Sequence, residues 1–356
     1  MQIDMVMDLG WGSSGKGGFA GWLALNNDYD TVTCAYGTQA GHTFNSARHN
    51  IKMMVQQLPV GIICPNVRQV LIGPGALIHA DVLSSEINRY GRHLAGKRLM
   101  IHEHAAVVTD QHSEMEYASG YTKIGSTGKG VGKAAMERLE RKPDANVVKN
   151  RFKGTDLEDF VVTREEYMRA MNESRNVLAE GAQGFCLSMY HGDYPYCTSR
   201  DVTPAQLVAD CALPWSVIQG IRVFGVARTY PIRVNNRDGY SGPAYPDQVE
   251  TSFEEIGVPA ELTTVTKLER RVFKHSQRQI AHAATYCMRG RDAVVLTFGD
   301  YCKTTEELIH LMDGIKASSG CDVEYVVFGP DFADVVDVRA CQKGEFVMQA
   351  MKRIGA

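Results

Sequence analysis

No excess of positive charge and no long apolar run occur in this sequence, and each absence argues against a class of protein. The 38 Lys and Arg residues against 41 Asp and Glu residues give a net charge of -3, which provides no basic field for a nucleic-acid backbone and disfavours direct nucleic-acid binding. No apolar stretch reaches the about 18 residues that a membrane-spanning helix needs. Because the chain also opens on a strand-like segment without a basic and apolar leader, we expect a cytoplasmic protein.

Closely spaced cysteine pairs and domain linkers are also missing. The nine cysteines are scattered from Cys34 to Cys341 with no C-x-x-C pair, a pattern that indicates reduced, mostly buried thiols rather than disulfides or zinc ligands. A chain of 356 residues with 44% hydrophobic residues can bury a large core. Length alone allows one to three domains, but the sequence contains no internal repeat, low-complexity run or proline-rich linker. We therefore expect a single domain over residues 1–356.

The segments that are present alternate between strands and helices. Gln2 to Leu9 is short, apolar and followed by glycine, as a buried strand is, and a helix is expected from Gly15. Asn176 to Glu180 reads as a strand after a helix that Thr163-x-x-Glu166 opens with a capping box. Two further strands, at 293–298 and 323–328, flank a helix that begins near Thr304. This pattern predicts an α/β fold with a mostly parallel central sheet flanked by helices.

Three stretches read as long loops, at 120–132, 181–203 and 235–266. Long loops in a compact α/β protein are usually functional. We therefore expect binding residues in these stretches, in addition to those of the glycine-rich loop at the N-terminus.

The first candidate site is "LGWGSSGKGG" (Leu9 to Gly18), which opens like a phosphate-binding P-loop. In such a loop the backbone N–H groups and the helix N-terminus hold phosphates, and the lysine, here Lys16, bridges the terminal ones. A P-loop has Ser or Thr after the lysine to bind magnesium, but here that residue is Gly17. Magnesium would then be held by Ser13 or Ser14, or by a second loop.

"YGTQAGHTFN" (Tyr36 to Asn45) is the candidate for that second loop. Its glycines allow the backbone to approach a phosphate or a metal, and the Gly41 carbonyl is a suitable ligand for a hard cation such as Mg²⁺. His42 could donate a hydrogen bond to a developing phosphate charge. Because a single histidine is more often structural, His42 alone does not identify a catalytic site.

Together these loops resemble those of the adenylosuccinate synthetase family, whose loops read Gly-Asp-Glu-Gly-Lys-Gly-Lys and Asn-Ala-Gly-His-Thr. The matching segments are Gly12 to Gly18 and Gln39 to Thr43. "IGSTGKGVGKA" (Ile124 to Ala134) is similar to the loop of that family that binds the substrate phosphate. "GAQG" with "HGDYPYCTS" (Gly181 to Ser199) and the later "TTVTKLERR" are also similar. The similar segments follow one another in the same order over most of the chain. Chance can produce one glycine-rich loop, but not a series of ordered matches.

The family joins aspartate to a purine nucleotide in two steps. The 6-oxygen of the purine takes the γ-phosphoryl group, and the aspartate amine then displaces phosphate. The resemblance implies catalytic roles for Ser13 and His42, a Mg²⁺ cofactor bound by Ser13 and Gly41, and a homodimer in which Arg141 reaches the substrate phosphate of the partner. The residues implied for the triphosphate donor are Ser13, Gly15, Lys16, Gly17, Gly41, His42, Thr43, Thr297, Phe298, Asp300, Gly329 and Pro330. Those implied for the nucleotide monophosphate are Ser13, Gln39, Ser126, Thr127, Arg141, Gln183 and Thr198, and those for aspartate are Thr264, Val265, Thr266 and Arg270.

Three departures from the family pattern indicate which substrates are used. Ser13 replaces the aspartate that removes the N1 proton; a serine hydroxyl is a poor general base, but it is small and leaves space for the 2-amino group of guanine. Leu268 replaces an arginine that contacts the ribose 2′-hydroxyl, which favours a deoxyribose because a buried unpaired hydroxyl costs about 1–3 kcal/mol. The family selects GTP with Thr-Lys-x-Asp; here Thr297-Phe298-Gly299-Asp300 suggests that Phe298 stacks on adenine.

These departures resemble the phage-encoded branch of the family, which converts dGMP, L-aspartate and ATP into 2-amino-2′-deoxyadenylosuccinate. The sequence does not distinguish ATP from dATP, and it does not identify the group that accepts the N1 proton. One alternative is a short adenylosuccinate synthetase that uses IMP and GTP. Another alternative is a P-loop switch without ligase activity. It does not explain the presence of the two segments between Gly181 and Ser199. A metal site at "HEH" (His102 to His104) is less favoured than a partly buried polar strand edge.

Overall fold

The centre of the molecule is a large sheet that is almost entirely parallel. The computed structural model describes residues 1–235, 240–262 and 267–354. The sheet has ten strands in the order β17-β16-β15-β11-β1-β10-β2-β5-β7-β9. Of its described pairs only β16 and β17 run antiparallel. The predicted α/β fold with a mostly parallel sheet is confirmed.

The strands of the main sheet are β1 (Gln2–Asp8), β2 (Thr31–Cys34), β5 (Gln69–Ile72), β7 (Arg98–His102), β9 (Val161–Val162), β10 (Asn176–Glu180), β11 (Gly220–Arg228), β15 (Ala293–Thr297), β16 (Val323–Val327) and β17 (Val335–Asp337). The α-helices are α1 (Lys16–Asn26), α2 (Ala80–Leu94), α3 (Asp110–Ala118), α4 (Val131–Glu140), α5 (Val148–Arg151), α6 (Arg164–Glu173), α7 (Pro204–Asp210), α8 (Phe253–Ile256), α9 (Gln277–Cys287), α10 (Thr305–Ser319) and α11 (Lys343–Met351). Smaller sheets pair β3 (His42–Ser46) with β4 (Ile51–Val55), β6 (Leu77–Ile78) with β8 (Ala106–Val107), and β14 (Arg271–Phe273) with both β12 (Ile232–Arg233) and β13 (Glu250–Thr251).

Local sequence signals set several of these boundaries. Strand β10 covers the predicted residues, and α6 begins at the predicted capping box, in which Thr163 Oγ1 accepts a hydrogen bond from the Glu166 amide. Thr304 caps α10 in the same way. All three predicted loops contain further elements: helix α4 begins at Val131, a 3-10 helix covers Phe185–Leu187, and β13 and α8 lie within 235–266.

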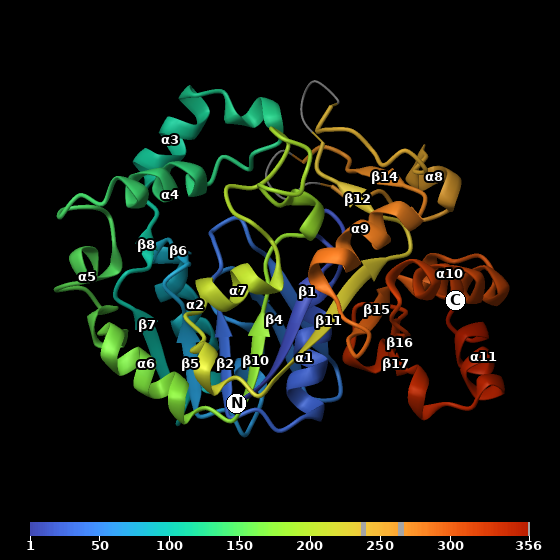
Figure 1. Ribbon diagram of the computed structural model, residues 1–356, viewed down its shortest axis with the longest axis horizontal. Helices are drawn as coiled ribbons and strands as arrows, with labels where there is room; N and C mark the ends of the chain where they lie inside the picture. The colour runs from blue at the N-terminus through green and yellow to red at the C-terminus, as the bar shows by residue number, and fades with distance from the viewer. Residues whose placement is uncertain (236–239, 263–266, 355–356) are drawn as a thin grey trace.

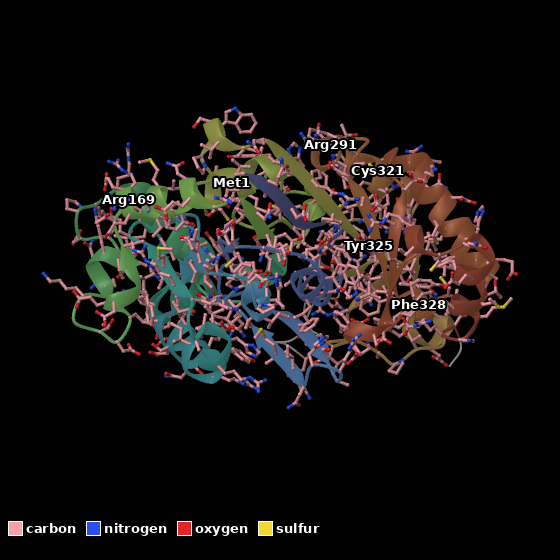
Figure 2. All side chains as sticks on the ribbon, turned by 90° about the horizontal axis from the view of Figure 1, so that it is seen from below. Met1, Arg169, Arg291, Cys321, Tyr325 and Phe328 are labelled. Carbon is pink, nitrogen blue, oxygen red and sulfur yellow. The ribbon has the colours of Figure 1, made fainter. Side chains whose placement is uncertain are left out.

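Helices lie on both faces of the sheet. Helices α6 and α7 cover one face, and α1 and α2 cover the other (Figures 1 and 2). Tyr325 of β16 lies in the densely packed interior beside α1 (Figure 2), where its ring contacts Phe19 and Trp22. All nine cysteines are free, and seven of them are buried. No helix in the described part of the chain is long and apolar enough to span a membrane.

The strand order creates a switch point at β1. The chain passes from β1 through α1 to β2 on one side, and it later passes from β10 to β11 on the other side of β1. In open parallel sheets, ligands bind beyond the carboxyl ends of the strands at such a point. The segments that follow β1, β2, β10 and β11 all gather at this end of the sheet, at the top of Figure 1.

Candidate active site

A buried carboxylate shapes the loop between β1 and α1. Asp8 ends β1 and is 1% exposed. Its Oδ1 accepts hydrogen bonds from the backbone N–H groups of Gly10 at 2.7 Å and Gly12 at 3.3 Å, and its Oδ2 lies 3.3 Å from Lys16 Nζ. Gly15 is the N-cap residue of α1; it adopts the left-handed conformation, with φ 79°, and provides no side-chain cap. The first amides of α1 therefore remain available to an anion, as a phosphate-binding loop requires.

The second loop packs directly on the first. A Cβ added to Gly17 would lie 2.7 Å from His42 Cβ and 3.0 Å from the Thr43 backbone nitrogen. One helical turn later, the Phe44 ring occupies the space in which Gly21 would carry a side chain. The missing hydroxyl after Lys16 thus has a steric reason, since strand β3 fills that space. Gly41, in contrast, is exposed, and its Cβ position has no atom within 4 Å.

His42 is held by a short hydrogen-bonded chain. The Tyr36 hydroxyl donates to Glu180 Oε2 at 2.7 Å and lies 2.8 Å from His42 Nδ1. Glu180 also accepts hydrogen bonds from the amides of Val60 and Gly61. Because the single hydrogen of Tyr36 goes to the carboxylate, the tyrosine oxygen must accept from His42, so that Nδ1 carries the proton. His42 is 6% exposed, and burial lowers its pKa.

Ser13 occupies the exposed tip of the first loop. Its φ is 52°, and its carbonyl accepts a hydrogen bond from Arg228 Nη1 at 2.9 Å. Arg228 is 4% exposed and forms an ion pair with Glu261. The neighbouring Ser14 hydroxyl is buried, without a hydrogen-bond partner among the described residues. The Ser13 side chain is therefore the one presented to a ligand, on a backbone fixed by a buried arginine.

The segment after β10 packs against the same loop. Gln183 has φ 57°, and the Cβ position of Gly12 lies 3.8 Å from its backbone carbon. A side chain on Gly184 would collide with Gly12 and with Asp8 Oδ1. The Gln183 Oε1 atom is buried and has no partner in the described part of the chain. These contacts place the backbone of Gln183 against Gly12, the residue that precedes the exposed Ser13.

The predicted base-binding segment adjoins the other side of the loop. The Cβ position of Gly15 lies 3.8 Å from Thr297 Cγ2 and 4.0 Å from Phe298 Cε2. The Arg228 guanidinium lies 3.6 Å from the centre of the Phe298 ring, so only the opposite ring face can meet a base. Thr297 Oγ1 donates to the Ala227 carbonyl and is therefore a strand contact. Burial raises the pKa of Asp300 to about 6.

A hydrogen bond connects the loop before α4 to the second loop. Thr38 Oγ1 donates to the Lys129 carbonyl at 3.1 Å. Within this loop the Ser126 hydroxyl is engaged with Glu116 and with the Gly128 amide. Thr127 is half-buried, and its hydroxyl makes no hydrogen bond among the residues described.

The remaining predicted residues differ in their exposure and in their contacts. Gln39 is half-buried and its Oε1 has no partner in the described ranges, Thr43 is exposed, and Thr198 is fixed by its amide to the Leu187 carbonyl. Gly329 follows β16 and packs on Asp334, and Pro330 beside it is exposed. Burial lowers the pKa of Arg270, whose amide donates to the Glu261 carbonyl. Arg141 ends α4, exposed and with φ 57°. Thr264, Val265 and Thr266 lie outside the described residues.

Sequence reasoning missed the residues that hold the loops in place. They are Asp8, Tyr36, Glu180, Arg228 and Glu261. Asp8 and Glu180 had a usable signal, because each is an acidic residue at the end of an otherwise apolar buried strand. The pairing of Arg228 with Glu261 joins positions 33 residues apart, and no local pattern indicates it.

Comparison with known proteins agrees with this architecture. Residues 5–149 and 143–313 match the family described as adenylosuccinate synthetase. The chain is 39% identical to the N6-succino-2-amino-2′-deoxyadenylate synthase of Acinetobacter phage SH-Ab 15497, over 93% of this chain and 92% of the relative. It is 41% identical to the enzyme of the same name from Vibrio phage phiVC8, over 94% of this chain and 97% of the relative.

A solved structure shares the whole fold. It is that of the cyanophage S-2L succinoaminodeoxyadenylate synthetase (PurZ) bound to dGMP and dATP as an energy donor, with a TM-score of 0.91, 36% sequence identity and coverage of 99% of both chains. The chain belongs to the adenylosuccinate synthetase family.

Proposed function

We propose that this chain is an ATP-dependent ligase that joins L-aspartate to dGMP through a 6-phosphoryl intermediate, giving 2-amino-2′-deoxyadenylosuccinate, ADP and phosphate. The observation that carries the proposal is the small, exposed Ser13 side chain on the loop that packs against Gln183, in a chain similar throughout to a cyanophage enzyme bound to dGMP and dATP. The relatives from Acinetobacter phage SH-Ab 15497 and Vibrio phage phiVC8 are both named N6-succino-2-amino-2′-deoxyadenylate synthase. By this likeness the reaction takes place in the cytoplasm of an infected host cell.

Ser13 and Gln183 contact the reacting edge of guanine in this proposal. A serine hydroxyl can accept a hydrogen bond from the 2-amino group, whereas the longer carboxylate of aspartate would crowd it. The hydroxyl orients the base, and the N1 proton passes to water or to a substrate phosphate, because serine is a poor base. The unpaired Gln183 Oε1 supplies an acceptor beside this edge.

His42 and Lys16 act on the phosphoryl group that moves. Lys16 exchanges its contact with Asp8 for the negative oxygens of the triphosphate, and the first amides of α1 hold the same group. With Nδ1 already protonated, His42 donates from Nε2 only as an imidazolium. The Glu180 carboxylate, reached through Tyr36, offsets that charge.

Mg²⁺ fits the same corner of the site. Gly41 is open to a ligand, and the exposed Ser13 hydroxyl adds a second hard oxygen donor. No cluster of three or more His, Cys, Asp or Glu side chains suited to a metal occurs within the described residues. The proposed ligands are therefore the Gly41 carbonyl, the Ser13 hydroxyl and phosphate oxygens, and the bound ion would neutralise the charge of those oxygens.

The other two substrates would bind to residues near Arg228. Adenine of ATP or dATP would stack on the face of the Phe298 ring opposite the Arg228 guanidinium, near Asp300 and Pro330. The aspartate substrate would be bound by the half-buried Arg270 together with Thr264, Val265 and Thr266. A guanidinium and a carboxylate form a bidentate pair, which suits recognition of aspartate.

A homodimer completes the proposed site through Arg141. The side chain is exposed at the end of α4, and in the proposed dimer it contacts the substrate phosphate bound to another copy of the chain. Four exposed apolar side chains lie on α3 and α4 nearby: Met115, Tyr117, Met136 and Leu139. Exposed apolar groups of this kind are typical of protein interfaces.

A substrate matrix tests the proposal. The purified chain is incubated with dGMP, GMP or IMP, each with aspartate and with ATP, dATP or GTP, and phosphate release and product mass are recorded. We expect turnover with dGMP, aspartate and an adenine nucleotide. A preference for IMP would assign the chain to ordinary adenylosuccinate synthesis, and nucleotide hydrolysis indifferent to aspartate would indicate a P-loop switch.

A further inference from the structure

A second buried carboxylate lies beneath the loop before α4. Glu116 belongs to α3 and is 3% exposed. Its Oε2 accepts hydrogen bonds from the Gly130 amide at 3.0 Å and from Ser126 Oγ at 3.3 Å, and its Oε1 accepts from the Gly132 amide at 2.8 Å. Three donors from one short loop therefore converge on one side chain.

Two of these donors belong to the first turn of α4. Gly130 is the N-cap residue of α4, and Gly132 lies in its first turn. The first amides of a helix have no partner within the helix and commonly bind a phosphate. Here Glu116 already accepts hydrogen bonds from two of them, the amides of Gly130 and Gly132. This differs from α1, where Asp8 accepts from the loop amides of Gly10 and Gly12 and from the Lys16 side chain, and from no backbone amide of the helix among the described residues.

The packing around Gly130 makes this arrangement rigid. Gly130 has φ 76°, and an added Cβ would lie 2.8 Å from His112 Cβ and 2.8 Å from the Ser113 amide nitrogen. The loop therefore sits against the backbone of α3 with no room to move toward it. Gly128 also adopts a positive φ of 66°, and the Tyr117 ring fills its side-chain space.

The two hydroxyl residues of the loop consequently differ. Ser126 Oγ donates to Glu116 and accepts from the Gly128 amide at 3.2 Å. Both its donor and an acceptor position are therefore engaged by this loop and by the helix beneath it. Thr127 has no such bond in the described part of the chain. Glu116 thus turns one hydroxyl inward and leaves the next one available for a ligand.

We infer that Glu116 is a positioning residue for the nucleotide monophosphate. Its carboxylate takes the place of a bound phosphate at the start of α4, fixes the loop through Ser126, and presents the Thr127 hydroxyl to the phosphate of the substrate. The inference rests on the proposed function, which assigns this loop to dGMP. It also assigns Ser126 an indirect role, through the loop, in place of direct contact with the substrate.

The test is Glu116→Gln with a matched control. The amide NH₂ of glutamine cannot accept from a backbone N–H, so the loop loses at least one of its three anchors. Glu86 offers the same chemistry elsewhere, since it is 7% exposed and accepts from the amides of Gln56, Gln57 and Leu58. Glu86→Gln therefore reports the loss of stability alone. Both variants are first compared with the wild type by thermal melting.

We expect Glu116→Gln to raise KM for dGMP about tenfold or more, with KM for ATP and for aspartate changed less than about twofold. Glu86→Gln should leave all three constants near the wild-type values. An unchanged or lower KM for dGMP in Glu116→Gln would overturn the inference, the latter because the carboxylate would then merely repel the substrate phosphate. If that variant does not fold, Ser126→Ala replaces it and should raise KM for dGMP selectively; an unchanged value would again overturn the inference.

The activity of the wild-type chain with dGMP distinguishes a failure of the proposed function from a failure of the role inferred for Glu116. Failure of the wild-type chain to bind or convert dGMP would refute the proposed function itself. Conversion of dGMP by the wild type, together with an unaltered KM in the variants, would refute only the role of Glu116.

Discussion

Gly17 packs directly against His42, with 2.7 Å between the position of an added Cβ and the His42 Cβ atom. The glycine-rich loop after β1 and strand β3, which begins at His42, are therefore in contact at the residue after Lys16. A serine or threonine there would displace β3, so the proposed Mg²⁺ would take its protein ligands from other residues. The steric contact accounts for the departure from the P-loop pattern.

Gly17→Ala should lower kcat about a hundredfold, since displacements of about 1 Å in a catalytic group can cost that much. Gly18→Ala is the matched control, because its added Cβ would meet only the Thr43 carbonyl at 3.9 Å. That change should keep activity and alter stability by less than about 1 kcal/mol. Steady-state kinetics of both variants decide the matter, and equal activity in the two would refute the steric account.

Ser13→Asp should raise KM for dGMP about tenfold by crowding the 2-amino group. The backbone can accept the change, because aspartate tolerates positive φ and Arg228 contacts only the carbonyl of residue 13. IMP lacks that amino group and should gain in relative kcat/KM. The measurement is a comparison of dGMP and IMP with each protein, and unchanged dGMP kinetics would show that Ser13 does not contact guanine N2.

The fold was predictable from the sequence because its signals are local. Capping boxes such as Thr163-x-x-Glu166 and apolar strands such as Asn176 to Glu180 depend only on neighbouring residues. The glycine loops were also visible, since their conformations require glycine. The supports of the site were not, because Tyr36 meets Glu180 across 144 positions and Arg228 meets Ser13 across 215. Such pairings exist only once the sheet has formed.

Tyr36→Phe should lower kcat about tenfold or more while changing KM for each substrate little. The variant removes the oxygen that accepts from His42 Nδ1 and leaves a buried donor unpaired. Tyr167→Phe is a suitable control, because Tyr167 is a buried tyrosine whose hydroxyl donates to the Cys211 carbonyl. Nitrogen NMR of the histidine ring would report the change of tautomer at His42. A wild-type tautomer and rate in Tyr36→Phe would contradict the hydrogen-bonded chain.

We expect the free energy of unfolding to fall in mild acid because His102 is buried in its neutral form. It is 4% exposed at the end of β7, its Nδ1 accepts from the His104 amide, and burial lowers its pKa from 6.5 to about 4. Between these two values the unfolded chain binds a proton that the folded chain does not. The free energy of unfolding therefore falls as the pH drops from 6.5 toward 4. After allowance for solvent screening, the contribution of this residue is about 1–2 kcal/mol.

His102→Gln removes the imidazole that takes up a proton in the unfolded chain. The glutamine side chain retains an oxygen that can accept a hydrogen bond from the His104 amide. The variant should lose about 1–2 kcal/mol less than the wild type between pH 7 and pH 4.5, as measured by urea unfolding at each pH. The same substitution at His104, whose side chain is 47% exposed, should change the pH profile less than His102→Gln does, because burial is the main cause of the lowered pKa of His102 and the charge of His104 is a smaller one. Because the sequence also allowed a metal site at His102 to His104, the melting temperature is measured with and without Zn²⁺. A large zinc-dependent rise, lost in both variants, would favour the metal site over the buried neutral histidine.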